Sequence, residues 1–267
     1  MFKLVKYMKL INKKVYLIGA GPGKNDFITI KANEILKNAD VIIYDSLINP
    51  SLLYELQENK YNDHRKKYIK VKKKRNYKSV SQTKIIKLII YYNKKNLCVI
   101  RLKSGDPLLF ARGGEELIEL LAHDIQVEII PGITTGISAY SYNKIPLSHR
   151  KWNSSITIIT GEIASSNKIK QINWQNIIIG SASLVIYMGI HNLFLIIDYC
   201  KIYGKNNEIP VALIRWNTWE EQEELIGTIG TIATQVYDKN FGPPAIILVG
   251  PLVEIRAIIK YNYAKFK

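Results

Sequence analysis

The sequence has little cysteine and little histidine, which argues against two common classes of site. Of its 267 residues, only Cys98 and Cys200 are cysteines and only four are histidines. The cysteines stand in or beside apolar segments, neither belongs to a CxxC motif, and the histidines are scattered. Metal-ligand spacing and a disulfide framework are therefore both missing. We expect no metal site, and two reduced, buried thiols.

Long apolar runs are also missing. A membrane-spanning helix needs about 18 to 20 consecutive apolar residues, and the nearest stretch, Ile177–Ile190, is interrupted by Gly180, Ser181 and Ser183. The basic residues 1–14 lack the apolar core and small-residue cleavage site of a signal peptide. We interpret them as a short N-terminal extension, and we expect a cytoplasmic protein without a membrane partner.

Acidic residues are too few to balance the basic ones. There are 22 Asp and Glu against 38 Lys and Arg, a net charge of +16, which can indicate a nucleic-acid partner. However, Lys, Ile, Asn and Tyr are abundant together, and all four have A/T-rich codons. Mutational drift then explains most of the surplus, so we predict no specific nucleic-acid partner. The basic run Lys60–Lys78 is interpreted as a mostly solvated loop.

Short β-branched runs that alternate with helical patterns predict an α/β architecture. This rhythm favours a largely parallel sheet with helices on both faces. The predicted strands of the first half are Val15–Ile18, Val41–Tyr44, Leu97–Leu102 and Val127–Ile130, and its predicted helices are Ile28–Ala39, Val80–Tyr92 and Gly114–Ala122.

The polar stretch Pro146–Ser155 interrupts this pattern and predicts a domain boundary. We expect an N-terminal α/β domain over residues 15–149 and a mixed α/β C-terminal domain over 150–267. In the second domain, four apolar residues at helical spacing are expected to form core. These are Leu193, Ile196, Ile197 and Cys200, and the strands predicted around them are Ile156–Ile159, Leu184–Tyr187, Val211–Ile214 and Ala245–Val249.

A glycine-rich turn, Gly19–Gly23, follows the first predicted strand and opens a helix. Glycines allow close backbone approach to a ligand, and a helix N-terminus offers free N–H donors. As a dinucleotide fingerprint, with Asp45 as ribose partner, the match is poor. Gly23 comes too early, and Pro22 lacks an N–H.

Two further strand ends carry polar and glycine residues. Arg101–Glu116 supplies cations, an aspartate before a proline, and glycines at a strand edge where α/β sheets bind ligands. A turn that leads into a helix start, with Glu115 and Glu116 favourable there, explains the same residues equally well. Ile130–Gly136 offers hydroxyls at another helix start, where one of the threonines is expected to be an N-cap.

Five segments of the chain, taken in order, resemble the motifs of the tetrapyrrole methylases. The similarity runs from about Val15 to Arg256 and is strongest to members that C-methylate uroporphyrinogen III. The segments are VYLIGAGPGKNDFITIKANEILKNADVIIYDSL, RLKSGDPLLFARGGEE, EIIPGITTGISAYSYNKIPLSHR, LVIYMGIHNL and PPAIILVGPLVEIR.

The resemblance implies a two-domain tetrapyrrole methylase fold with a mainly parallel N-terminal sheet. It implies a homodimer that holds S-adenosyl-L-methionine between its domains, releases S-adenosyl-L-homocysteine and uses no metal. Two methyl transfers would give precorrin-2 through precorrin-1, for sirohaem or cobalamin. Alternatives are another corrin-pathway methyltransferase, a ribosomal-RNA ribose methyltransferase of the same fold, or an inactive relic. The RNA branch has a Gly-Thr-Pro-Ile-Gly-Asn type opening, unlike this chain.

The resemblance also assigns roles to single residues. Asp45 falls on the proposed general base, and alignment through Gln82 places the proposed catalytic lysine at Lys73. Because the expected substrate is a polycarboxylate, Lys103, Arg112 and Arg150 are candidates to bind its acidic arms. The expected cofactor contacts are Pro22, Ser104, Gly105, Asp106, Leu109, Thr134, Thr135, Met188, Asn217 and Ala245.

This chain departs from the family pattern at three places. Ser104 replaces a glycine of the cofactor segment, and Lys72–Lys74 replaces a Gly-Lys-Arg segment. Asn217 replaces the glycine of a late Gly-Thr turn. Asparagine enters the left-handed region more readily than most residues, so we expect Asn217 to have a positive φ. On that basis the Asn217→Gly substitution is expected to be neutral or to tighten cofactor binding.

Overall fold

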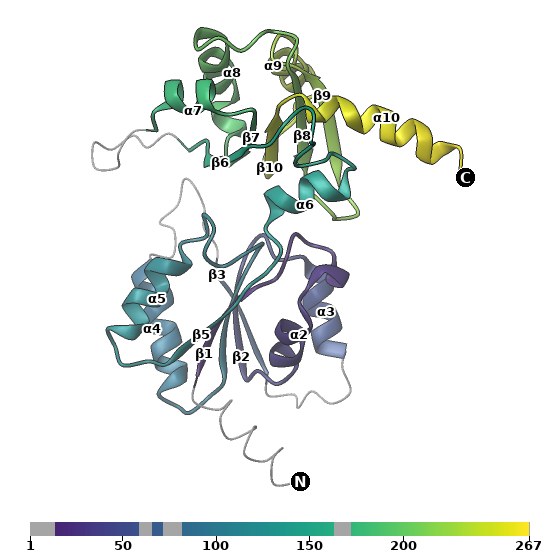
Figure 1. Cartoon of the computed structure of the whole chain (residues 1–267). Coiled ribbons are helices and arrows are strands. Elements are labelled where there is room, and N and C mark those ends of the chain that lie inside the picture. Colours follow the sequence, from purple (N-terminus) through teal and green to yellow (C-terminus); the bar gives the residue numbers. More distant parts are fainter. Residues whose placement is uncertain (1–13, 59–65, 72–81, 163–171, 267) are drawn as a thin grey trace. The chain divides into compact units, whose positions relative to one another are not determined.

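The computed structural model describes residues 14–58, 66–71, 82–162 and 172–266 (Figure 1). The chain divides into two compact units between Thr135 and Gly136. This division lies before the polar stretch at 146–155, where the sequence predicted the boundary, because helix α6 (Thr135–Tyr142) forms hydrogen bonds with the second unit. Tyr140 Oη donates to the Leu184 carbonyl at 3.4 Å, a contact that ties this helix to a strand of the second unit.

The first unit contains an all-parallel five-stranded sheet in the order β3-β2-β4-β1-β5. Its register pairs Val15 with both Val99 and Val127. The parallel sheet confirms the expectation from the sequence. The strands are β1 (Val15–Gly19), β2 (Val41–Asp45), β3 (Lys67–Val71), β4 (Val99–Lys103) and β5 (Val127–Ile130).

Helices cover both faces of this sheet, as Figure 1 shows. Alternate strand residues point to opposite faces. Ile18, Ile42 and Ile100 therefore pack against α2 (Ile30–Lys37) and α3 (Pro50–Glu58). Their neighbours in the strands, such as Leu17, Ile43 and Val99, pack against α4 (Gln82–Asn93) and α5 (Gly113–Leu121).

The structure corrects two sequence predictions in this unit. Lys67–Val71, inside the run predicted as a loop, forms the edge strand β3, which pairs in parallel with β2 and buries Val71 while Lys67 and Lys70 stay exposed. Lysines on an edge strand hinder pairing with other chains. Helix α2 begins at Ile30 rather than Ile28 because Thr29 is its N-cap, accepting a hydrogen bond from Ala32 N at 3.2 Å.

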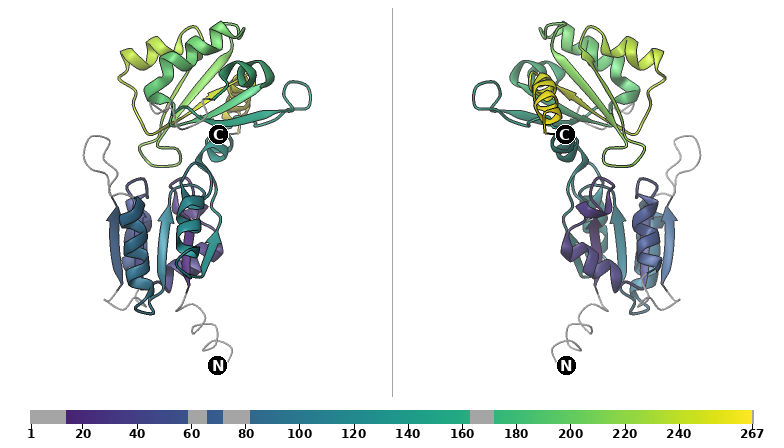
Figure 2. Two further views of the ribbon diagram at one scale, coloured as in Figure 1. Left: turned by 90° about the vertical axis from the view of Figure 1, so that its left-hand side faces the viewer. Right: turned by 90° about the vertical axis from the view of Figure 1, so that its right-hand side faces the viewer.

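The second unit contains a mixed sheet in the order β6-β7-β10-β8-β9, in which β6 and β7 pair in parallel and the other neighbouring strands pair antiparallel. The helices beside it can be followed in the side views of Figure 2. The strands are β6 (Ile156–Thr160), β7 (Ser183–Tyr187), β8 (Pro210–Arg215), β9 (Glu223–Thr228) and β10 (Ala245–Val249). The helices after α6 are α7 (Trp174–Gly180), α8 (Leu193–Ile202), α9 (Ile232–Asp238) and α10 (Leu252–Ala264).

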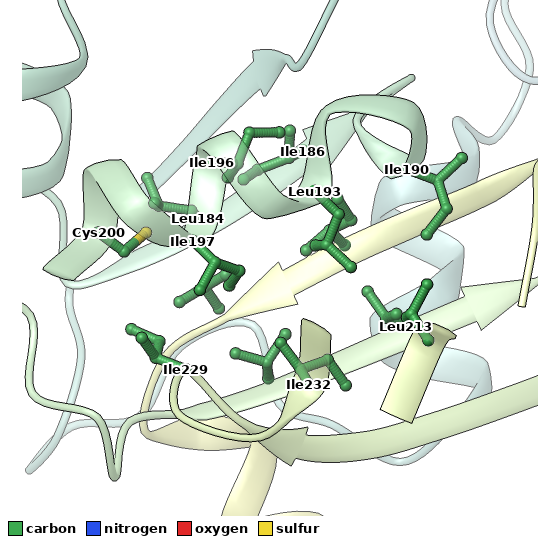
Figure 3. Packing of buried hydrophobic residues seen from close by; sticks show 14 of the residues in the cluster. Leu184, Ile186, Ile190, Leu193, Ile196, Ile197, Cys200, Leu213, Ile229 and Ile232 are labelled. Carbon is green, nitrogen blue, oxygen red and sulfur yellow. The ribbon is translucent and has the colours of Figure 1, made fainter. Parts of the chain in front are cut away.

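One face of this second sheet packs on α8 and α9 (Figure 3). The four α8 residues predicted as core are buried there, which confirms that prediction, and full burial of each aliphatic side chain contributes about 1.5 to 3 kcal/mol. Leu225 of β9 joins this core, so its neighbour Glu224 points to the other face. Arg256 of α10 pairs with Glu224, and α10 therefore covers that opposite face.

Candidate active site

The carboxyl ends of the parallel strands in the first unit gather most of the residues predicted for the site. β4 lies between β2 and β1, and β1 lies between β4 and β5. The loops that follow these four strands are therefore neighbours at one edge of the sheet. This is the edge where open α/β sheets bind ligands.

Three of these loops approach one another backbone to backbone. A Cβ atom on Gly19 would lie 2.5 Å from the Gly105 carbonyl oxygen and 2.7 Å from Gly132 N. A Cβ atom on Gly132 would lie 2.3 Å from the same Gly105 oxygen. Gly105 also exchanges two backbone hydrogen bonds with Gly21, at 2.8 and 3.2 Å. Only glycine permits this packing at positions 19 and 132, so the loops form a fixed platform.

Asp106 binds two of these loops together. Its Oδ1 accepts a hydrogen bond from Leu108 N at 2.9 Å, and its Oδ2 accepts one from Gly132 N at 3.3 Å. Both carboxylate oxygens are thus used within the protein. Any contact of Asp106 with a ligand would use the remaining lone pairs of these oxygens.

A buried cluster of charges lies beneath this platform, on the face covered by α4 and α5. Arg101 Nη2 donates to Asp45 Oδ1 at 2.6 Å, and Arg101 Nε donates to Glu116 Oε1 at 3.2 Å. Lys103 Nζ and Gln82 Nε2 donate to the same Glu116 oxygen at 2.9 and 2.6 Å. The side chains of Arg101, Lys103 and Glu116 are at most 1% exposed, whereas Asp45 is 23% exposed. We call these five residues the charge cluster.

The charge cluster changes the interpretation of Lys103, which we had expected to bind an acidic arm of the substrate. Its ammonium is buried and bonded to Glu116. Burial lowers the pKa of Lys103 and the neighbouring Arg101 lowers it further, while Glu116 and Asp45 oppose the shift. Because the Lys103 ammonium is enclosed and paired with Glu116, it is not exposed for contact with a substrate.

Sequence reasoning missed Glu116 as a member of the charge cluster and treated it only as a favourable charge at a helix start. The sequence did contain a signal for a buried acid, since Arg101 and Lys103 stand two residues apart, and so on one face, of an otherwise apolar strand. Two buried cations require a buried acid. Among the described residues, Glu116 Oε2 has no hydrogen-bond partner, so all three donors converge on Oε1.

The two arginines predicted to bind substrate lie on the surface. Arg112 precedes α5 with a φ of 61° and makes a two-pronged contact with Glu115, its Nη2 lying 2.5 Å from Oε2. Arg150 is exposed in the turn that contains the bridge between His149 and Asn153. Both guanidinium groups stay accessible enough for a ligand to contact.

The remaining predicted contacts divide between the two units. In the first, Ser104, Leu109, Thr134 and Thr135 are half-buried at the loop platform and Pro22 is buried beside it. In the second, Met188 follows β7 with a φ of 53° and is 47% exposed, and Ala245 starts β10 as a buried residue. Lys73, the predicted catalytic lysine, lies outside the described residues.

Asn217 does not have the conformation expected from the sequence. Its neighbours Trp216 and Thr218 carry the positive φ values, 48° and 69°, and Asn217 does not. The Asn217 side chain is buried, where Nδ2 donates to Ser138 Oγ at 2.8 Å and Oδ1 accepts from Asn143 Nδ2 at 3.2 Å. The expectation of a left-handed Asn217 was wrong, because its flanking residues turn the chain and direct its amide inward.

Asn217→Gly is consequently expected to destabilise the protein. Two buried hydrogen bonds are lost, which costs about 1 to 3 kcal/mol in the free energy of unfolding. Urea denaturation measures this loss. A matched control is Asn240→Gly, at an exposed position with a φ of 48°, which should change the stability by less than about 0.5 kcal/mol. Equal effects of the two substitutions would contradict this role of Asn217.

Comparison with known proteins gives the same family. Residues 14–233 match the model of the tetrapyrrole (corrin/porphyrin) methylases. The chain belongs to this family. It is therefore an S-adenosylmethionine-dependent methyltransferase with the two-domain tetrapyrrole methylase fold.

Named relatives of this tetrapyrrole methylase agree with one another. A uroporphyrinogen-III C-methyltransferase of Cyanidium caldarium is 44% identical over 93% of this chain and 96% of that protein. A siroheme synthase of Pseudomonas fluorescens is 36% identical over 93% of this chain and 52% of its own length. The uroporphyrin-III C-methyl transferase of Thermus thermophilus, solved with S-adenyl homocysteine, is 26% identical. It superposes with a TM-score of 0.75 over 91% of this chain and 99% of that chain.

None of the described helices is long and apolar enough to cross a membrane. Among the same residues, no group of three or more His, Cys, Asp or Glu side chains is arranged to hold a metal ion.

Proposed function

We propose that this tetrapyrrole methylase transfers methyl groups to carbon atoms of uroporphyrinogen III, giving precorrin-2 through precorrin-1. The observation that carries the proposal is Asp45, a partly exposed carboxylate held by a buried arginine. It lies at the edge where open α/β sheets generally bind ligands. The high identity to a named uroporphyrinogen-III C-methyltransferase supports the choice of substrate. The siroheme synthase relative supports sirohaem as the end product.

The loop platform of the first unit fits an S-adenosylmethionine-type ligand. Such a ligand presents an amino acid, ribose hydroxyls and a flat base, which call for backbone groups and hydroxyl donors. The platform offers Ser104, Thr134 and Thr135 as half-buried hydroxyls beside backbone fixed by close glycine packing. When bound, the cofactor supplies an electrophilic methyl group on its sulfonium.

Asp45 is suited to accept a proton from the substrate. Its Oδ1 is held by Arg101, and among the described residues its Oδ2 has no hydrogen-bond partner. A carboxylate with one anchored and one available oxygen has a defined orientation, which a general base requires. In this proposal the methyl group joins a fully substituted pyrrole carbon, and Asp45 removes the proton that the macrocycle must then lose from another position. The loop platform sets the alignment of the reactants.

The remaining predicted residues have binding or proton-transfer roles in the proposal. Arg112 and Arg150 contact carboxylate arms of the substrate, because their guanidinium groups are exposed and match carboxylates in geometry. Lys73 is retained as the second proton-transfer group. Met188, Asn217 and Ala245 are retained as cofactor contacts of the second unit, and Asn217 would act there through the turn that its side chain holds.

The reaction itself gives the direct test. The purified chain is incubated anaerobically with S-adenosyl-L-methionine and uroporphyrinogen III, and the products are read by mass spectrometry. We expect a product with two added methyl groups, preceded by one with a single methyl group. Methylation of a different corrinoid, with none on uroporphyrinogen III, would overturn the choice of substrate.

Cofactor binding can be tested separately from turnover. S-adenosyl-L-homocysteine binds only the folded chain and should therefore raise its melting temperature. A ligand at 100 times its Kd adds about 2.7 kcal/mol to the free energy of unfolding. Calorimetry or differential scanning fluorimetry measures the shift, with adenosine alone as a control that should give much less. An unchanged melting temperature at saturating ligand would contradict cofactor binding.

A further inference from the structure

The buried position of Arg101 is costly and needs an explanation. It lies in β4 between Leu17 of β1 and Ile43 of β2, beside the aliphatic side chains that pack against α4 and α5. Placing a charge in an apolar interior costs several kcal/mol unless it is paired and fully hydrogen-bonded. A leucine or valine there would pack without that cost.

The hydrogen bonds of Arg101 hold its guanidinium in one orientation. Nη1 donates to the carbonyl oxygens of Ile43 and Leu102, at 3.4 and 3.2 Å. Nε donates to Glu116, and Nη2 donates to Asp45. Four acceptors on three elements therefore fix a planar group that cannot lose its proton.

Of the described residues that this fixed guanidinium contacts, the partly exposed one at the sheet edge is Asp45, through its Oδ1. The acidic side chain that neutralises Arg101 from below is Glu116, whose Oε1 also binds Lys103 and Gln82. The charge cluster thus has a buried end that is anchored by several donors. The other end of the cluster is the Asp45 carboxylate, whose Oδ2 has no hydrogen-bond partner among the described residues.

We infer that Arg101 is a positioning residue that sets the orientation of Asp45, with Glu116 and Lys103 as the buried frame that holds Arg101 in place. The inference rests on the proposed role of Asp45 as a proton acceptor. Arg101 is 0% exposed and so does not itself touch substrate. It acts by presenting Asp45 Oδ2 in a constant direction.

Arg101→Lys is the variant that tests this inference. Lysine keeps the positive charge that Glu116 and Asp45 require, so the protein should still fold. A single ammonium cannot reach both carboxylates and the two carbonyl oxygens, and Asp45 should therefore lose its fixed orientation. Small displacements of a catalytic group cost about a hundredfold, and we expect kcat to fall about ten- to a hundredfold with the affinity for S-adenosyl-L-homocysteine unchanged.

A double-mutant cycle distinguishes positioning from general support of the fold. In the Asp45→Asn background, Arg101→Lys should cause no further loss of kcat, because the group that it orients is already removed. A matched control is Arg215→Lys, since Arg215 pairs with Glu223 on β8 and β9 outside the charge cluster. This control should leave kcat unchanged. A kcat in Arg101→Lys equal to the parent value, or a loss that multiplies with that of Asp45→Asn, would overturn the inference.

A crystal structure of Arg101→Lys gives a second readout that needs no activity. The Asp45 side chain should leave its present rotamer or occupy more than one. If Asp45 keeps its orientation in the variant, Arg101 does not position it, whatever the kinetics. If the parent chain fails to methylate uroporphyrinogen III, the proposed function fails, and the crystal structure still decides the positioning role.

Discussion

Asp45→Asn is expected to reduce the turnover of uroporphyrinogen III by at least about a hundredfold. General bases contribute about 10²–10⁴ in rate, and an amide cannot accept the proton that the macrocycle loses after methylation. The variant should still bind S-adenosyl-L-homocysteine, because Asp45 lies on β2, away from the close packing of the loops after β1, β4 and β5. Single-turnover measurements with saturating substrate give the rate.

The structure adds a cost in stability to this substitution. Asparagine can still accept the hydrogen bond from Arg101, but the charge opposite the buried guanidinium is removed. Hydrogen bonds to charged groups contribute about 1.5 to 3 kcal/mol, so a loss within that range is expected in urea denaturation. The control is Asp26→Asn, because the Asp26 side chain is 72% exposed beside Lys24. This substitution should change neither the turnover nor the free energy of unfolding. Near-normal turnover in Asp45→Asn would remove Asp45 from the mechanism, leaving Asp106 as the next candidate.

Glu116→Gln is expected to produce the largest loss of stability. Glu116 is the only acidic residue that pairs with both Arg101 and Lys103 among the described residues. Removing one partner of a buried ion pair costs about 3 to 5 kcal/mol, because the remaining charges stay buried without compensation. The neighbouring Glu115→Gln is a matched control. Glu115 is 59% exposed and pairs with Arg112 at the surface, so its loss should be below about 0.5 kcal/mol.

The pH dependence of this loss identifies Lys103 as its source. Burial already lowers the pKa of Lys103 below the ordinary value of 10.5, and loss of Glu116 lowers it further. Between the folded-state pKa and 10.5 the unfolded chain binds more protons, so the free energy of unfolding rises with pH. In Glu116→Gln that rise begins at a lower pH. The difference in the free energy of unfolding between the parent and Glu116→Gln should therefore be largest near pH 7 and smaller near pH 10. A difference that stays constant with pH would contradict this account.

The sequence was sufficient for the elements whose signal is local. The short β-branched runs at Val127–Ile130 and Ala245–Val249 coincide with β5 and β10, and the helical spacing of Leu193 and Cys200 correctly predicted the core face of α8. These features follow from local composition and from the spacing of apolar residues, which a short window of the sequence already displays. The edge strand β3 escaped detection because an exposed strand needs little apolar character.

The ordered motifs also determined the family before any geometry was known. They placed Asp45 and Asp106 at strand ends, since glycine turns after β-branched runs mark the carboxyl edge of a parallel sheet. Spacing along the chain could not show which groups bond to one another. Only the fold brings Glu116 of α5 to Arg101 of β4.

Tertiary structure therefore decided the use of each charge and each polar side chain. Lys103 is a buried partner of Glu116 instead of a surface ligand for an acidic arm, and Asn217 holds a turn through its amide instead of through a left-handed backbone. Both outcomes depend on partners at other places in the chain. Glu116 is 13 residues from Lys103, and Ser138 is 79 residues from Asn217. The sequence by itself determined the family, the strand ends and the candidate base. The directions of the side chains were decided by packing, because a buried charge or amide takes the orientation that satisfies all of its hydrogen bonds together.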